Sequence, residues 1–406
     1  MAELAEPLLD PVLIKKDSLE QTLSSMIERA SNVTDVLAKA SFDNETNTKK
    51  VKRYSVTQAA KILGRTTQTI RAAEQSGAIP EPKRNENGRR AGYTLNDINN
   101  MRAHFKIRTG RLDSENPVIM SFQNFKGGVG KTTLSCHFAQ YMAEKGYRVL
   151  LIDADSQAST TMTFGFKGGD VSQEQTLYSC LVGDEETLHY AIRETHWDQL
   201  HIVPASLDLY GAEYQLAAVA GDLDDQSWVE ALRDGIKSVE TNYDLILIDA
   251  PPALGMISLN VLKSLSGLVI PAPAAMIDFH STATFLAMLK EVMEAVAVDY
   301  EDGSQFDFFK IMLSKYDGSR PSQDFVAKLT QQQFAENMLK NWFIQSAEID
   351  NASSQWQTVY ELDSPTGSRR TYKRCVESMN AVFADVEHEI RMTWPSHEQE
   401  IRGIAV

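Results

Sequence analysis

The chain has 406 residues and a formal net charge of −15, with 40 Lys and Arg residues against 55 Asp and Glu residues. This length suggests two or three domains of roughly 100–200 residues, and a content of 43% hydrophobic and 23% charged residues excludes a disordered or fibrous chain. The three cysteines, Cys136, Cys180 and Cys375, form no close pair, so we expect a reducing cytosol and no cysteine-held metal cluster. We find neither the ~18 uninterrupted apolar residues of a membrane span nor the features of a signal peptide in residues 1–16, so we expect no membrane contact.

The first predicted element is an amphipathic helix over residues 18–37. Ser18 and Gln21 match the capping-box pattern, and apolar residues then recur at spacings of three and four. The polar stretch 41–50 that follows has little to bury. No nearby segment would cover the apolar stripe, so we expect residues 1–45 to pair with a second copy and make a homodimer. The alternative is a helix that packs on its own chain.

The charge is unevenly distributed along the chain. Between Lys49 and Arg111, 15 basic residues stand against four acidic ones, so this segment carries +11 and the rest of the chain −26. A surface that meets only water usually mixes both signs. A block this one-sided therefore indicates a nucleic-acid surface.

Residues 54–105, inside an expected domain of residues 46–112, are typical of a helix-turn-helix. One helix is predicted from Thr57, a turn at Gly64, and a second helix that ends at Gly77. The start of the second helix would meet the major groove, with the side chains of Arg65, Thr66, Thr67, Gln68 and Arg71. A glycine-centred hairpin would form a basic wing with Lys83, Arg84, Arg89 and Arg90. The segment resembles the winged-helix domain of the MerR type, whereas an ordinary three-helix bundle is the alternative.

After residue 111 the pattern changes to short apolar runs separated by helical stretches. Each run is typical of a strand that is buried on both faces, and the alternation predicts a parallel α/β sheet flanked by helices. The expected strands are 117–124, 147–155, 200–205, 244–252, 267–273 and 306–314. The clearest expected helices are 131–145, 228–239, 281–298 and 370–392, the last of which ends before Pro395.

The strongest signal is the sequence SFQNFKGGVGKTTLS between the first strand and the first helix of this region. Glycines allow a backbone to approach phosphate oxygens, and the following helix adds its positive end. Lys131 can reach the β- and γ-phosphates, and the Thr132 hydroxyl can bind Mg²⁺. The usual phosphate-loop pattern fails at Phe125, where glycine is expected, and a second lysine, Lys126, precedes the glycines. The expected nucleotide-binding residues are Lys126, Gly127, Gly128, Val129, Gly130, Lys131, Thr132 and Thr133.

Three aspartates end predicted strands near this loop. Asp249 ends a strand expected beside the loop's own strand, where a carboxylate would hold Mg²⁺ through water. Asp153 and Asp155 end another strand, where the run breaks into a loop. A single aspartate at such a position is often a helix N-cap, but three beside one phosphate loop favour a metal and catalytic site.

The double-lysine loop resembles the deviant Walker A motif of the ParA/MinD ATPases. LLIDADSQAST resembles the second motif of that family, with Ser156 in place of the usual proline, and LILIDAPPALG resembles its Walker B motif. The resemblance covers roughly residues 115–395 of an expected ATPase domain of residues 113–406. With the two N-terminal segments, the chain resembles the large ParA partition ATPases of phage-like plasmids.

The resemblance implies specific roles. Thr132, Asp153 and Asp249 would serve the Mg²⁺ ion, and Asp155 would position the attacking water. Lys126 would reach the phosphates of a partner protomer, so Lys126, Lys131 and Asp155 form the expected catalytic set for the hydrolysis of ATP to ADP. An inserted cation stabilises phosphoryl transfer, so hydrolysis would require dimerisation.

The resemblance also implies a cellular function. The chain would drive plasmid partition in the bacterial cytoplasm through ATP-dependent, non-specific binding to nucleoid DNA. A ParB-type centromere-binding partner and DNA would stimulate a weak basal ATPase, and the ADP form would repress its own operon at an operator. Basic residues at the start of the last helix resemble those used on non-specific DNA: Arg369, Arg370, Lys373 and Arg374.

Other functions fit the sequence less well. An iron-protein reductase needs a pair of cysteine ligands that the three cysteines do not supply. A cofactor-amidating synthetase needs an amidotransferase domain for which no segment is left. A repressor with a passive nucleotide would need neither Asp155 nor Lys126.

Overall fold

The computed structural model describes residues 19–39, 49–167, 170–220, 227–296, 306–362 and 364–402. Within them, seven strands form one sheet in the order β3-β4-β2-β5-β1-β6-β7. Every neighbouring pair is parallel except β3 and β4. The strands are β1 (Val118–Phe122), β2 (Val149–Asp153), β3 (Arg193–Glu194), β4 (Leu200–Val203), β5 (Leu245–Asp249), β6 (Gly267–Pro273) and β7 (Phe308–Ser314).

The predicted parallel α/β sheet is confirmed, because six of the seven strands fall on the six apolar runs. The antiparallel edge strand β3 was not predicted, since its two residues are too few to make an apolar run. Alternate side chains of each strand enter two separate hydrophobic cores, as the pleat requires. In β1, for example, Met120 belongs to one core and Ile119 to the other.

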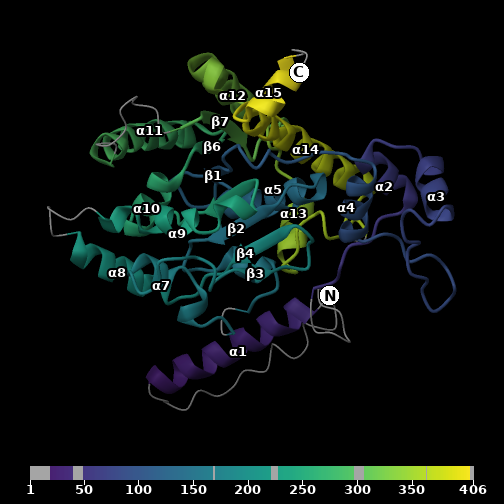
Figure 1. The fold of residues 1–406 in the computed structure, drawn as a ribbon. Coiled ribbons are helices and arrows are strands. Elements are labelled where there is room, and N and C mark those ends of the chain that lie inside the picture. The colour runs from purple at the N-terminus through teal and green to yellow at the C-terminus, as the bar shows by residue number, and fades with distance from the viewer. Residues whose placement is uncertain are drawn as a thin grey trace.

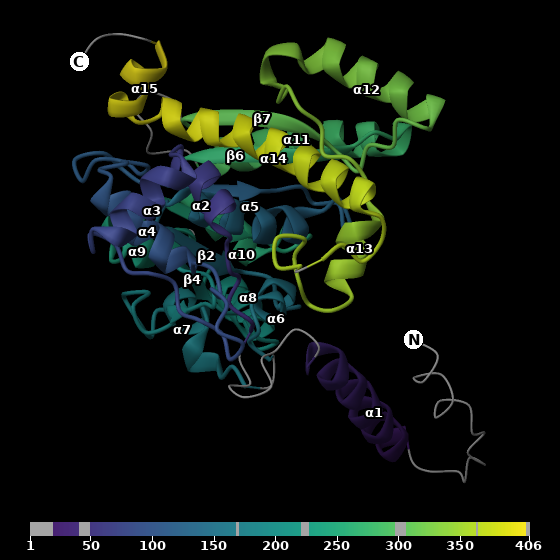
Figure 2. The same ribbon diagram turned by 90° about the vertical axis from the view of Figure 1, so that its right-hand side faces the viewer.

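The two cores place helices on both faces of the sheet, which gives three layers (Figures 1 and 2). The first core is closed by α5 (Lys131–Lys145), α13 (Ala347–Ser353) and α14 (Arg369–Met392). The second core is closed by α7 (Tyr178–Leu181), α8 (Leu209–Val219), α9 (Ala231–Lys237), α10 (Met256–Ser264) and α11 (Met276–Val296). The other helices of this part are α6 (Ser159–Thr163), α12 (Pro321–Phe334) and α15 (Pro395–Arg402), with 3₁₀ turns at Gln173–Gln175, Ser227–Val229, Glu240–Asn242 and Ala335–Asn337.

Several helix boundaries differ from those predicted. The helix expected over 228–239 is divided into a 3₁₀ turn and α9. Helix α11 begins at Met276, five residues before its expected start. The last predicted helix stops at Met392 as expected, but Pro395 opens α15, a helix that the sequence analysis missed. Proline suits the first turn of a helix, where its missing N–H would have no intrahelical partner.

The basic segment forms three helices, α2 (Val56–Leu63), α3 (Thr67–Gln75) and α4 (Leu95–His104). Ser55 and Gln58 make a capping box at the start of α2, and Gly64 ends it in a left-handed conformation at φ +59°. Between α3 and α4 the chain turns back on itself, with one antiparallel bridge from Arg84 to Arg90. The helix-turn-helix and its hairpin therefore form as the sequence predicts.

These helices are not a separate body, because one hydrophobic core contains their apolar side chains and those of α5 and the sheet. The main contact of these helices with the rest of the chain is at the C-terminal end of α5. The Glu144 carboxylate accepts hydrogen bonds from the Tyr54 hydroxyl at 2.8 Å and from Lys52 Nζ at 3.3 Å. Its backbone carbonyl accepts one from the buried Arg102 guanidinium, and the Gly146 carbonyl accepts one from Thr109 at 3.0 Å.

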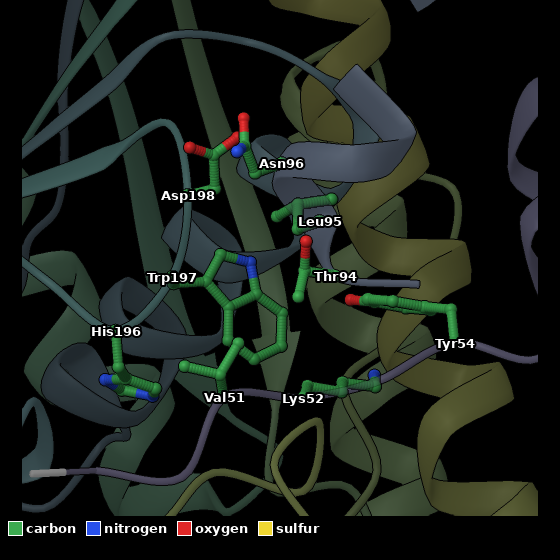
Figure 3. A pocket seen from close by; sticks show the side chains of 9 residues that line it. All are labelled: Val51, Lys52, Tyr54, Thr94, Leu95, Asn96, His196, Trp197 and Asp198. Carbon is green, nitrogen blue, oxygen red and sulfur yellow. The ribbon is translucent and has the colours of Figure 1, made fainter. Parts of the chain in front are cut away.

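A cavity of about 230 Å³ lies beside this contact between the basic segment and the C-terminal end of α5 (Figure 3). One wall carries side chains from the basic segment, and the other comes from the loop between β3 and β4. Lys52 Nζ lies 5.4 Å from the centroid of the Trp197 ring and 5.0 Å from that of Tyr54. The lining residues are Val51, Lys52, Tyr54, Thr94, Leu95, Asn96, His196, Trp197 and Asp198.

Helix α1 (Leu19–Lys39) stands apart from the rest of the described chain in both views (Figures 1 and 2). Its apolar stripe is open to solvent, with Leu19 75% and Ile27 67% exposed. The expected cap at Ser18 and the expected boundary near residue 45 lie outside the described residues. The expected alternative, in which this helix packs on its own chain, is not the arrangement seen here.

A buried ion pair anchors the segment that follows. Lys49 Nζ lies 3.0 Å from Glu361 Oε2, and both side chains are less than 5% exposed. Gln140 of α5 donates to the other oxygen of Glu361 at 2.7 Å. Burial alone would raise the pKa of Glu361, but the Lys49 ammonium and its hydrogen-bonding neighbours outweigh burial and hold the pKa at about 2.

We therefore predict that Glu361→Gln lowers the free energy of unfolding by about 3 kcal/mol at pH 7, because Lys49 is left as an unpaired buried charge. The pKa of Glu361 is lower in the folded chain than its ordinary value of 4.5. Its stabilisation is therefore complete above pH 4.5 and is lost as the pH falls towards 2. Urea unfolding from pH 7 to pH 3 should show a flatter pH dependence for the variant.

Glu377→Gln is the matched control, because Glu377 pairs with Lys373 on an exposed helix face at 3.6 Å. This variant should change the free energy of unfolding by less than about 0.5 kcal/mol. Equal effects of the two variants would contradict the anchoring role of Glu361.

Candidate functional site

The loop of residues 123–130 joins the end of β1 to the start of α5. Gly128 and Gly130 adopt φ values of +73° and +103°, a region that other residues rarely occupy. Gly130 is also the N-cap of α5, so the first backbone N–H groups of that helix face the loop. This geometry is that of an anion-binding loop at a helix N-terminus.

Contacts from distant strands hold this loop in place. The Ser314 hydroxyl at the end of β7 donates to the Val129 carbonyl at 3.1 Å. The Asn124 side chain accepts from the Lys126 backbone N–H at 3.0 Å and donates to the Pro271 carbonyl at 3.0 Å. These supporting residues were not predicted from the sequence. For Asn124 a signal existed, since a polar pair directly follows a buried strand.

Lys131 points back over the loop. It is 6% exposed, and its ammonium donates to the Lys126 carbonyl at 3.3 Å. Burial lowers its pKa, while the carboxylates of Asp249 and Asp155 act in the opposite direction. A lysine ammonium carries three donors, and this carbonyl accepts only one of them. The position suits a cation that meets phosphate oxygens within the loop.

Asp249 ends β5 between β1 and β2 and is 1% exposed. Burial raises its pKa, whereas hydrogen bonds from the hydroxyls of Thr160 and Thr132 lower it. The Thr160 hydroxyl lies 2.7 Å from Asp249 Oδ2, and the Ser135 hydroxyl lies 3.4 Å from Oδ1. The structure thus brings Thr132 and Asp249 together.

Asp153 lies directly beside Asp249 in the register of β2 and β5. It is fully buried, and its pKa is raised by burial and by the neighbouring Asp249 carboxylate. Its oxygens accept hydrogen bonds from the backbone N–H groups of Asp155 and Thr161 and from the Thr161 hydroxyl. Asp155 is half-buried and accepts from the Gln157 N–H at 3.0 Å.

The donor set fits a divalent cation bound together with phosphate. Two buried carboxylates stand side by side at the ends of β2 and β5, and burial is the main cause of their raised pKa values. Among the described residues there is no cluster of three or more His, Cys, Asp or Glu side chains suited to a metal. Mg²⁺ typically uses one or two carboxylates, waters and substrate phosphates instead of an all-protein cage.

Lys126 does not join Lys131 in this protomer. Its ammonium forms an ion pair with Asp278 in the first turn of α11. The preceding Phe125 packs edge-on against Phe285 of the same helix, with ring centroids 4.7 Å apart. The two residues by which the loop departs from the usual pattern therefore both contact α11, and the sequence analysis missed this helix as part of the site.

A cavity of about 80 Å³ opens beside the start of α5. No residue that would contact a nucleotide base was predicted from the sequence. The lining of this cavity joins the loop to the segment before and within α13. It consists of Gly130, Thr133, Lys315, Phe343, Ile344, Gln345, Ser346, Ile349, Asp350 and Ser353.

The expected DNA-contacting residues of the helix-turn-helix lie on the surface. Arg65, Gln68 and Arg71 are exposed at or near the start of α3. Thr66 is the N-cap of α3, and its side chain accepts from the Thr69 N–H at 3.1 Å, so it serves the helix itself. Thr67 is half-buried in the first turn.

The basic hairpin divides into two kinds of residue. Lys83, Arg84 and Arg89 are exposed, and Arg84 donates to the Gly88 carbonyl at 3.0 Å within the hairpin. Arg90 instead forms an ion pair with the buried Glu74 of α3. Arg90 therefore ties the hairpin to α3.

The four C-terminal basic residues are exposed on the first turns of α14, whose N-cap is Ser368. Positive side chains at a helix N-terminus oppose the helix dipole and cost stability. Lys373 is partly neutralised by Glu377 at 3.6 Å. Arg369 and Arg370 lie where an anion would be attracted both by the helix end and by the guanidinium groups.

None of the helices formed by the described residues is long and apolar enough to cross a lipid bilayer.

Comparisons with known proteins agree with this geometry. Residues 118–300 match the family described as AAA domain, and residues 54–108 match the MerR HTH family regulatory protein. Protein SopA of Escherichia coli (strain K12) is 33% identical over 353 residues, covering 84% of this chain and 90% of that protein. The chromosome-partitioning ATPase Soj of Thermus thermophilus is 31% identical, covering 64% of this chain and 95% of Soj.

A solved structure has the same fold over almost the whole chain. This structure, titled Partition Protein, superposes with a TM-score of 0.64 at 21% identity and covers 91% of this chain and 98% of its own. The match to SopA likewise extends over most of both chains. The chain belongs to the ParA-type partition ATPases that carry a helix-turn-helix ahead of the ATPase domain.

Proposed function

We propose that the chain hydrolyses ATP to ADP and uses the cycle to segregate a low-copy plasmid. One observation carries this proposal. Asp153 and Asp249 lie side by side at the ends of β2 and β5, and Lys131, the first residue of α5, folds back over the neighbouring phosphate loop. A passive nucleotide site would not need two acidic groups at the phosphate end. A relative named as a chromosome-partitioning ATPase supports partition of DNA as the biological process.

We assign the binding roles as follows. The N–H groups of the loop and the Lys131 ammonium would hold the phosphates of ATP or ADP, and the cavity beside Gly130 and Thr133 would take the base. Mg²⁺ would be held by Thr132 and by Asp249 through water, where it neutralises phosphate charge. Asp153 would support this shell and also fix the turn that carries Asp155.

We assign two further roles to hydrolysis. The Asp155 carboxylate would orient the attacking water, since it is half-buried and near the Lys131 ammonium. Lys126 of one protomer would reach the phosphates of the other, so that turnover depends on an ATP-bound homodimer. A ParB-type centromere-binding partner and DNA would stimulate a weak basal rate.

We propose two separate DNA surfaces. The start of α3 and the hairpin would bind an operator as a repressor, most strongly in the ADP form. The basic turn of α14 would bind nucleoid DNA without sequence preference when ATP is bound. These surfaces lie on different elements, and the proposed cytoplasmic, nucleoid-associated location in a bacterial host follows from the second one.

Two variants should separate binding from hydrolysis. Lys131→Ala should weaken ATP binding by about 10- to 100-fold, because a charged hydrogen-bond donor is lost from the phosphates. Asp155→Ala should retain ATP binding and reduce kcat by about 100-fold or more, since water orientation matters in the transition state. Equilibrium binding of labelled ATP and steady-state turnover measure the two effects.

Lys145→Ala provides the control, because Lys145 ends the same helix and its exposed side chain pairs with Glu387 at 3.5 Å. It should leave both quantities unchanged. If Asp155→Ala hydrolyses ATP at the normal rate, water positioning is not its role. If Lys131→Ala binds ATP normally, the loop is not the phosphate site.

The two DNA surfaces should be separable by point substitutions. Deletion of the basic segment is unsuitable, because it would expose the core that this segment shares with α5. Arg65→Ala with Arg71→Ala should weaken operator binding, whereas Arg369→Ala with Arg370→Ala should weaken binding to random duplex DNA. Each lost phosphate contact should also reduce the salt slope by about one.

Titrations against operator and random duplex at several salt concentrations measure both effects. Lys237→Ala is the control, since Lys237 is exposed and pairs with Asp234 at 2.7 Å, away from both surfaces. Equal loss on both DNAs from either double substitution would indicate one shared surface and would contradict the proposal.

The exposed stripe of α1 should make a dimer that does not depend on nucleotide. A lone helix of this length is marginal in water unless one face is packed. Leu23→Asp with Ile27→Asp should therefore give monomers in the absence of nucleotide while ATP binding survives. Sedimentation velocity measures the result, with Gln21→Asp and Asn32→Asp on the polar side of α1 as the matched control. A dimer of unchanged strength would place the constitutive interface elsewhere.

A further inference from the structure

Helix α11 contacts both residues that make the phosphate loop unusual. Asp278 pairs with Lys126 and Phe285 packs against Phe125, and these two helix positions are seven residues apart. A separation of seven residues puts two side chains on the same face of a helix. The backbone around Lys126 is also fixed, because Asn124 accepts from its N–H and Lys131 donates to its carbonyl.

The ion pair is partly shielded from water. The Asp278 side chain is 13% exposed and the Lys126 side chain 35%. Asp278 also lies in the first turn of α11, where a carboxylate is stabilised by the helix dipole. Asp278 is therefore a well-held counter-charge, whereas Lys126 is the longer and more accessible partner.

The ion pair with Asp278 conflicts with the proposed trans role of Lys126, in which its ammonium contacts the phosphates bound by the other protomer. The latch described below rests on that proposed role. An ammonium bound to Asp278 in its own protomer cannot at the same time meet phosphates in a second protomer. The competent conformation therefore requires the ion pair to break, and any cost of breaking it reduces the apparent affinity of one protomer for the other. Two such pairs must break in each symmetric dimer.

We propose that Asp278 is a latch that restrains Lys126 until a second copy of the chain approaches. Asp278 acts through Lys126 and is a positioning residue. Directly before it, Met276 and Ile277 are 51% and 72% exposed, so apolar surface is available beside the latch. A second protomer that covers these side chains would exclude water from the ion pair as Lys126 transfers to the partner's phosphates.

Asp278→Asn should release the latch, because the amide keeps the shape of the side chain and removes its charge. In nucleotide-free protein, the amine of Lys126 should react faster with an amine-selective reagent, with Lys145 as the internal reference in the same mass-spectrometric measurement. With ATP, the protein concentration for half-maximal dimerisation should fall by about five-fold per latch.

Asp324→Asn is the matched control, because Asp324 is a first-turn aspartate of α12 that pairs with Lys328 at 2.8 Å. It should change neither quantity. Asp278→Glu, which keeps the charge, should behave like the native chain. A loss of helix stability alone would not accelerate labelling of Lys126 or lower the dimerisation midpoint.

The outcomes distinguish a failure of the latch from a failure of the proposed trans role of Lys126. If Asp278→Asn leaves Lys126 labelling unchanged, or raises the dimerisation midpoint, the latch is wrong and Asp278 does not restrain Lys126. If Lys126→Ala turns over ATP at the native rate, the trans role itself is wrong. If Lys126→Ala is inactive while Asp278→Asn changes nothing, the trans role stands and the latch fails.

Discussion

Helix α5 is the constraint on which the rest of the molecule depends. Its N-terminus adds a positive helix end to the phosphate loop. At its other end, the Glu144 side chain and the carbonyl of the C-cap Gly146 accept hydrogen bonds from the basic segment that carries the helix-turn-helix. Gln140, between these ends, holds Glu361 and through it the Lys49 anchor. Helix α5 therefore contacts both the proposed nucleotide site and the helix-turn-helix, and it connects the two within each protomer.

The distribution of charge supports the same view. A strongly acidic chain would be repelled by DNA if its charge were evenly spread, yet groups of exposed cations lie at the start of α3, on the hairpin and on the first turns of α14. Cations that serve the fold are instead paired, as Arg90 is with Glu74 and Lys49 with Glu361. Lys126 and Lys373 are proposed to meet phosphate and are also paired with a carboxylate, so pairing alone does not separate the two groups of cations.

Much of the fold could be predicted from local sequence signals. Buried parallel strands appear as apolar runs, and the glycines around Lys131 indicate the loop because few other residues adopt its backbone angles. The missing parts depend on partners that are distant in the chain. Asp278 lies 152 residues after Lys126 and Ser314 lies 185 residues after Val129, so no local pattern reports either contact. The attachment of the helix-turn-helix was also not predicted, since Tyr54 and Arg102 look like ordinary core or surface residues until α5 is placed beside them.

The central claim, that each site is completed by the lysine of the other protomer, is tested most directly by mixing two variants. Lys126→Ala keeps Asp155 but cannot serve its partner, and Asp155→Ala keeps Lys126 but cannot orient its own water. In a mixed dimer, one site has both groups. Turnover in an equal mixture should therefore rise to about a quarter of the native rate, the share expected when equal amounts pair at random in two-fold dimers. A mixture as inactive as its components, or a Lys126→Ala protein that is fully active alone, would contradict the account.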